Sequence, residues 1–574
     1  MKIEQPPLQE KFIPAKPRLR GINETLALLG SETGPDGQRI NWKDLHEKVG
    51  AWDSGLELSD KIREVVREYL LSKFPKIKAK IPAIEDLPDP KMLNALSNGW
   101  FEELGEEVGG TRKEVLLAVL AHLTRRIENR IYKKTLETAG EDGLRKLGLS
   151  PNLRQLTMDC LDTTVKSDPL FVRFLAYSQL APKPTEDASP VAPLGQDKKP
   201  HTFRELFPQE TGFIFKKLAA IARQDEAWRN EPGAQEFKTY LKYLSDFFAE
   251  TDPKQAAALH KKVEETYGEL VSSDFPIMIV PPLEGYYLPP YLDPELKVAI
   301  RTPETRAQEG DYRAMQQALA DKLGQLGVGQ FADDMRQRMI RNYISIGSFG
   351  VGMTFNAVAQ ETPAIALYLN DQIRAYDKDL KKFLPLIADS ERAFAKTPAE
   401  DIQAMSRKDT ILHELSHTVY PTPTPEAQRL GADQESVIAE IMAESVYRGL
   451  AEELIAENKL GCTEDQYVST TICMPLQVIE GSDADDEYYQ AAVFVLDGLF
   501  EKGIAKFDGS KIHVKNHAAF FQYFRDNAKE IIALYEDPKM TKTKAKKWLA
   551  ENCQAGSKLQ KLIDHLKAHP RAAG

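Results

Sequence analysis

Residues Lys408–Tyr420 read KDTILHELSHTVY and contain an H-E-x-x-H pattern at His413–His417. Apolar residues recur around this pattern at helical spacing, and neither Gly nor Pro interrupts it. On a helix, residues four apart share one face, so His413 and His417 can direct both imidazoles at one point. Two imidazoles so placed, with Glu414 beside them as a general base, are typical of zinc hydrolases. The chain has 10 His in all, so this arrangement is improbable as a chance motif on a solvent-facing helix.

A third metal ligand is expected on the next predicted helix. The proline-rich segment 421–425 is followed by DQESVIAEIMAESVYRGL, which begins at Asp433. Catalytic zinc sites use three protein ligands and keep one position open for water. The spacing from His417 does not decide between Glu435 and Glu440. We predict Glu440 as the third ligand because it belongs to the pattern Glu440-Ile-Met-Ala-Glu444, and we keep Glu435 in reserve.

Glu440 and Glu444 form an E-x-x-A-E pattern, with two carboxylates one turn apart. A ligand histidine usually donates its other ring N–H to a nearby carboxylate. We assign this task to Glu444, and the alternative for Glu444 is an ordinary surface acid.

Composition restricts the class of protein. The 574 residues are 42% hydrophobic and 28% charged, with a net charge of −11, which argues against a nucleic-acid-binding protein. We expect no membrane association, because no apolar run is long enough to span a bilayer and the first residues do not resemble a secretory signal. The 4 scattered cysteines fit reduced thiols in a cytoplasmic protein.

The pattern of helical and strand-like segments predicts a mainly α fold with a smaller β portion (α+β). We predict helices at 203–223, 235–250, 254–270, 312–343 and 378–387, and strands at 276–281, 344–355 and 364–369. The predicted organisation is a mostly helical region at 1–180, a Pro-rich linker or loop at 181–200 and a metallohydrolase region at 201–574. Within the last region, the β-containing part covers about 275–370 and the zinc-binding helical part about 400–505, with C-terminal helices to 574.

Several motifs together resemble the dipeptidyl peptidase III family and its shorter bacterial zinc-hydrolase relatives, which are gluzincin metallopeptidases. The similarity covers roughly Leu283–Gly503 and rests on His413–His417, Glu440–Val446, Tyr291–Pro294 (Y-x-D-P), Leu369–Arg374 and Gln490–Gly503. The resemblance implies two lobes, one helical and zinc-binding and one containing β-structure. It also implies that Tyr291 supports the transition state and that Asn370 and Asp371 bind the substrate's N-terminal amine. From the residues alone, Tyr291 could equally be a packed aromatic, and Asn370-Asp371 could be a turn.

The sequence departs from the family pattern at two places. The histidine motif has five residues, whereas the best-studied members have the six-residue form H-E-x-x-G-H. Tyr488 or Tyr489 stands where the family has an auxiliary histidine. Efficient release of dipeptides is therefore less strongly implied than zinc binding.

These patterns predict a zinc-dependent metallopeptidase with one zinc ion per chain and a peptide or small amide as substrate. An exopeptidase that releases short units from peptide N-termini follows from the resemblance. Two alternatives remain: a zinc hydrolase of a non-peptide amide or other small molecule, and a catalytically inactive metal-containing binding protein. The sequence leaves the oligomeric state open.

Overall fold

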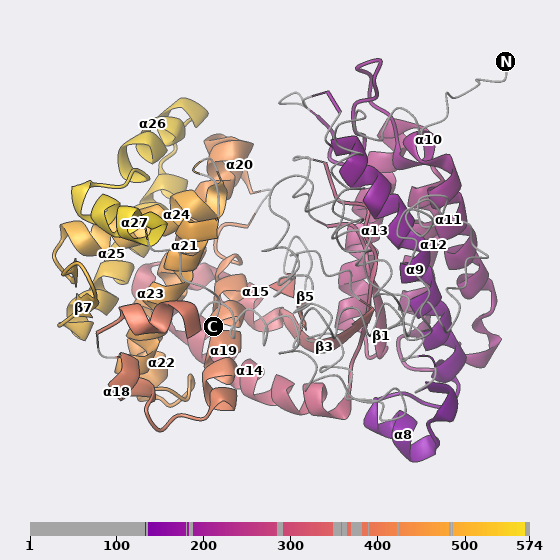
Figure 1. Ribbon diagram of the computed structural model, residues 1–574, viewed down its shortest axis with the longest axis horizontal. Helices are drawn as coiled ribbons and strands as arrows, with labels where there is room; N and C mark the ends of the chain where they lie inside the picture. Colours follow the sequence, from indigo (N-terminus) through magenta and orange to yellow (C-terminus); the bar gives the residue numbers. More distant parts are fainter. Residues whose placement is uncertain are drawn as a thin grey trace, which may run out of the picture. The chain divides into compact units, whose positions relative to one another are not determined.

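The computed structural model describes residues 133, 136–178, 181–182, 188–283, 291–347, 357–358, 364–368, 381–388, 390–421, 424–481, 484 and 486–568. The chain divides into two compact units: unit 1 comprises 1–303 and 343–354, and unit 2 comprises 304–342 and 355–574. Most of the described elements are helices and a minority are short strands (Figure 1). The prediction of a mainly α fold with a smaller β portion is therefore confirmed.

Unit 1 is built from helices and short strands. Its described helices are α8 (Glu141–Lys146), α9 (Leu153–Ser178), α10 (Phe203–Leu206), α11 (Pro208–Arg223), α12 (Ala234–Ala249) and α13 (Pro253–Ser272). The single helix predicted at 203–223 is two helices, because Pro208 starts a new first turn. Thr202 and Glu205 form a capping box at the start of α10, and Asp252 caps α13. Polar side chains at these positions thus define where the helices begin.

Two buried strands of unit 1 pair in antiparallel fashion. Strand β1 (Ile277–Val280) pairs with β2 (Lys297–Ile300), so that Ile277 lies opposite Ile300. Strand β2 pairs in turn with β3 (Met339–Gly347), with Ile300 opposite Ile344. Every residue of β1 and β2 is buried, including Lys297 at the start of β2.

Unit 2 is mostly helical. Its elements are α14 (Pro303–Lys322, in this unit from Glu304), α15 (Ala332–Gln337), β4 (Ala357–Val358), β5 (Ala364–Tyr368), α17 (Lys381–Phe383), α18 (Ser390–Phe394), α19 (Ala399–Ser416), α20 (Pro425–Leu430), α21 (Ala432–Gly449), α22 (Ala451–Ala456), α23 (Glu464–Gly481), α24 (Glu487–Glu501), β6 (Ala505–Phe507), β7 (Ile512–Val514), α25 (His517–Glu536), α26 (Lys542–Asn552) and α27 (Ser557–Ala568). Strands β4 and β5 are antiparallel, and so are β6 and β7.

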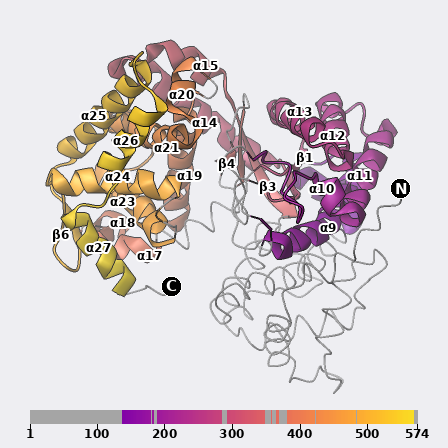
Figure 2. The ribbon, with the colours of Figure 1, turned by 90° about the horizontal axis from the view of Figure 1, so that it is seen from above.

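Helix α21 is the centre of unit 2. It packs against α19, α24 and α25, and Figures 1 and 2 both show it among these helices. Eleven of its residues are buried, including the small Ala443, Ser445 and Gly449. A Cβ atom at Gly449 would lie 3.0 Å from the backbone nitrogen of Arg525 on α25, so glycine permits the close approach of these two helices. The two helices that carry the H-E-x-x-H and E-x-x-A-E motifs therefore lie side by side.

The structure differs from the sequence prediction at the helix predicted before strand β3. The helix predicted at 312–343 begins earlier, at Pro303, and strand β3 already starts at Met339. The predicted linker or loop at 181–200 is assigned to unit 1, and Val191 and Ala192 within it are buried. The division into domains stays a prediction. Within the described residues, we find no helix with both the length and the apolar character needed to cross a bilayer.

Candidate metal centre

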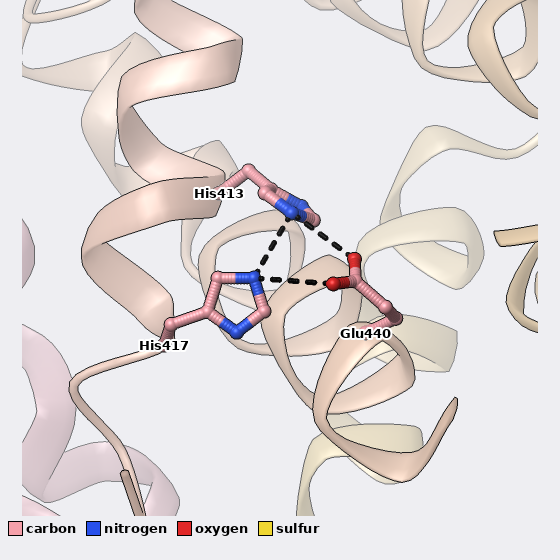
Figure 3. A group of neighbouring side chains, drawn as sticks. All are labelled: His413, His417 and Glu440. Carbon is pink, nitrogen blue, oxygen red and sulfur yellow. Dashed lines mark hydrogen bonds and ion pairs between the residues drawn. The ribbon is translucent and has the colours of Figure 1, made fainter. Parts of the chain in front are cut away.

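Three side chains from α19 and α21 converge on one point (Figure 3). The Nε2 atom of His413 lies 3.2 Å from Oε2 of Glu440, and the Nε2 atom of His417 lies 3.6 Å from Oε1. The two Nε2 atoms are 3.1 Å apart. One potential ligand atom from each residue lies within 4.8 Å of the other two, so all three can reach a single ion.

The end of helix α19 positions both histidines. His413 lies in its last turn, whereas the helix ends at Ser416 and His417 is the residue that caps it. His417 nevertheless keeps a nearly helical backbone, with φ −63° and ψ −6°, and therefore stays on the same face as His413. The geometry expected from the i, i+4 spacing is present at the helix terminus.

The donor set fits a zinc ion. Two imidazole nitrogens and one carboxylate form a common set of three protein ligands in catalytic zinc sites. Oε2 of Glu440 is buried and lies 3.2 Å from Nε2 of His413, so both atoms could bind one cation placed between them. The side chains of His413 and His417 retain 18% and 25% exposure.

Burial and the two acidic neighbours set the charge states of this group. Burial alone would lower the pKa of His413, but its hydrogen bonds to Glu440 and Glu444 raise that pKa well above the usual value. Burial lowers the pKa of His417 to about 4. Burial opposes ionisation of Glu440, yet the neighbouring histidines hold its pKa below the usual range. The site therefore presents a carboxylate and a neutral imidazole to an incoming cation.

Two further charged residues, Glu444 and Arg448, extend the chain of polar contacts that starts at His413. Its Nδ1–H donates to Oε1 of Glu444 at 2.8 Å, which is the contact predicted for Glu444. The other carboxylate oxygen of Glu444 pairs with Arg448. Sequence reasoning overlooked Arg448, although the spacing offered a signal: Glu440, Glu444 and Arg448 follow each other at four-residue intervals on one face of α21.

Two further predicted residues lie on the same helices. Glu414 follows His413 directly on α19 and is partly buried. Burial lowers the pKa of Arg338, and the negative charge of Glu414 partly offsets this effect. Glu435, the reserve ligand, forms a hydrogen bond with Tyr535 and is not part of the group of three. Of the two candidate carboxylates, Glu440 is the one placed beside the histidines.

The remaining residues singled out from the sequence belong to unit 1, to α24 or to the part of the chain outside the described residues. Tyr291 belongs to unit 1 and is fully buried, and burial raises its pKa. Asn370 and Asp371 lie outside the described residues. Tyr488 and Tyr489 lie in the first turn of α24, where their backbone N–H groups donate to the Asp486 carboxylate; the Tyr488 side chain is exposed. Their roles remain predictions.

Comparison with known proteins gave two structural matches. No family model matches the chain, and neither does any curated protein. The solved structure of DPP III from Caldithrix abyssi shares 16% sequence identity and has a TM-score of 0.48, over 84% of this chain and 93% of that chain. The structure of dipeptidyl-peptidase III from Corallococcus sp. strain EGB shares 16% identity with a TM-score of 0.47, over 87% of this chain and 95% of that one.

Proposed function

We propose that this protein is a zinc-dependent metallopeptidase. The observation that carries the proposal is the convergence of His413, His417 and Glu440 within 4.8 Å, with Glu414 next to the first ligand. His413, His417 and Glu440 would hold one zinc ion per chain. When bound, the ion would supply Lewis acidity for the hydrolysis of an amide bond.

Glu414 is the general base of this proposal. It would accept a proton from the attacking water and return it to the leaving amine, a role that contributes about 10²–10⁴-fold to rate. Glu444 would keep the Nδ1 proton on His413, so that Nε2 presents its lone pair to the ion. Tyr291 is proposed to stabilise the oxyanion by donating its phenol hydrogen bond, a role implied by the family resemblance.

The proposed reaction is the release of short units from the free N-termini of peptides by a cytoplasmic protein. This rests on the resemblance of Tyr291–Pro294 and Leu369–Arg374 to family motifs, with Asn370 and Asp371 binding the α-amine. A second candidate is the hydrolysis of a non-peptide amide by the same metal centre. It is favoured by the tyrosine, either Tyr488 or Tyr489, that stands where the family resemblance implies an auxiliary histidine.

A peptide library, incubated with zinc-loaded protein and analysed by mass spectrometry, tests the proposal. We expect products shortened from the N-terminus by a constant number of residues, and no cleavage when the N-terminus is acetylated. Equal cleavage of free and acetylated peptides would eliminate amine recognition. If metal analysis found no zinc in the purified protein and none bound on titration, the metallopeptidase assignment would be refuted.

A further inference from the structure

The side chain of Arg448 is completely buried, with 0% exposure, one turn beyond Glu444 on α21. Arginine is almost never fully buried unless its charge is paired, because desolvating an ion costs several kcal/mol. The groups around this guanidinium therefore indicate why a charged side chain is buried at this position.

Three polar groups surround the guanidinium. It forms an ion pair with Glu444, its Nε–H donates to the hydroxyl of Tyr447 at 3.0 Å, and Nη2 lies 3.9 Å from Oδ2 of Asp409. The Tyr447 hydroxyl in turn donates to the same Asp409 oxygen at 2.9 Å. Tyr447 and Asp409 thus contact guanidinium nitrogens other than the one that pairs with Glu444.

Aromatic rings restrict the same group further. The guanidinium carbon lies 5.3 Å from the ring centroid of Tyr447 and 5.6 Å from that of Phe524. Both distances fall within the range of cation–π contacts. Although burial opposes its charge, the carboxylate of Glu444 raises the pKa of Arg448, so it remains a cation in this interior.

The two oxygens of Glu444 therefore have separate tasks. Oε1 accepts the Nδ1–H of His413, and Oε2 pairs with Arg448. A carboxylate held at both oxygens cannot rotate away from the imidazole without breaking an ion pair in a buried site. Both the ring orientation and the tautomer of His413 thus depend on Arg448, two contacts away.

We propose that Arg448 is a positioning residue for the metal centre: it locks Glu444 so that His413 keeps its proton on Nδ1 and offers Nε2 to the ion. Tyr447 and Asp409 hold the guanidinium in place for this task. The inference rests on the zinc site proposed above. It adds that zinc affinity depends on a cation that touches neither the ion nor the substrate.

The test is a zinc titration, by competition with a chromophoric chelator, of the wild type, Arg448→Met and Arg525→Met. Arg525 is a matched control, because it also pairs with two carboxylates, but these are Glu452 and Glu453 instead of Glu444. We expect Arg448→Met to bind zinc about tenfold more weakly, at the low end of the effects seen for groups that orient a ligand. Arg525→Met should stay within about twofold of the wild type, as befits a site with no contact to the ligands.

Tyr447→Phe keeps the test decisive if Arg448→Met does not fold. This variant keeps the aromatic ring and removes only the hydroxyl that joins Arg448 to Asp409, so the fold should survive. We expect Tyr447→Phe to bind zinc more weakly than the wild type, as Arg448→Met does. Arg448→Lys, which keeps the positive charge, should bind zinc more tightly than Arg448→Met. Wild-type affinity in Tyr447→Phe, or equal losses in the two arginine variants, would overturn the proposal. A wild type that binds no zinc would instead remove the metal centre itself.

Discussion

The Nε2 atoms of His413 and His417 face each other 3.1 Å apart. Because His413 donates its Nδ1 proton to Glu444, Nε2 is the ring nitrogen that is left for a metal ion. Two ring nitrogens and a buried carboxylate oxygen directed at one point are best satisfied by a shared cation. This relationship is the physical basis of the predictions about the site.

Replacing Glu414 by Gln should separate metal binding from turnover. The amide keeps the size of the side chain but cannot accept a proton, so we expect unchanged zinc content and a turnover lower by about 10²–10⁴-fold. Metal analysis and steady-state kinetics on a cleaved peptide measure the two effects. Unchanged turnover would show that another group is the base, and loss of zinc would show that the substitution disturbs the ligands.

The two carboxylates considered as third ligand can be compared directly. Glu440→Gln should weaken zinc binding by more than the roughly 10–100-fold typical of residues that only orient a ligand. Glu435→Gln, on the same helix, should bind zinc like the wild type, because Glu435 contacts Tyr535 instead. Zinc titration of both variants measures this difference. If the two lose affinity equally, Glu440 has no special role.

Helix geometry explains how much of the site was predictable. The i, i+4 spacing alone places His413 and His417 on one face, and two glutamates five residues apart differ by about 140° around a helix, so Glu435 and Glu440 cannot both face the histidines. Helical spacing alone does not say which of the two does so, because this depends on how α21 packs against α19. Arg448 was overlooked because its burial depends on the same packing.

Strand β3 shows where the secondary structure predicted from sequence patterns was wrong. Residues 339–343 were included in a predicted helix, but they form the first part of β3. The β3 residues that pair with β2 lie between Ile344 and Gly347, within the run that was predicted as a strand. The strand predicted at 364–369 was identified correctly, since Ala364–Tyr368 forms β5. Its β-branched and aromatic content agrees with its pairing to β4.

The same substitution at two helical glycines should have opposite effects on stability. A Cβ atom at Gly498 on α24 would lie 2.7 Å from Cζ of the buried Tyr523, whereas one at Gly310 on α14 meets nothing within 4 Å. We expect Gly498→Ala to destabilise the protein by about 1–3 kcal/mol through overpacking. Gly310→Ala should stabilise it by roughly 0.5–1 kcal/mol, because alanine favours the helix. Thermal unfolding measures both effects, and a shift of the same sign in the two variants would contradict this packing.

The turn between β6 and β7 should make a pH-dependent contribution to stability. Asp508 accepts hydrogen bonds from the backbone N–H groups of Lys511 and Ser510, both at 2.8 Å, and pairs with His513 at 2.8 Å. The Lys511 N–H, with smaller contributions from His513 and Ser510, holds the pKa of Asp508 well below its usual range.

A carboxyl group whose pKa is lower in the folded state stabilises the fold above its unfolded pKa of about 3.9 and loses that effect as the pH falls toward the folded value. We therefore expect Asp508→Asn to unfold at a lower temperature than the wild type at pH 7, and the gap between them to narrow progressively below about pH 4. Unfolding curves recorded from pH 7 to pH 2.5 measure the gap. A constant gap over this range would mean that the ionised carboxylate contributes nothing and that the substitution acts through the turn geometry alone.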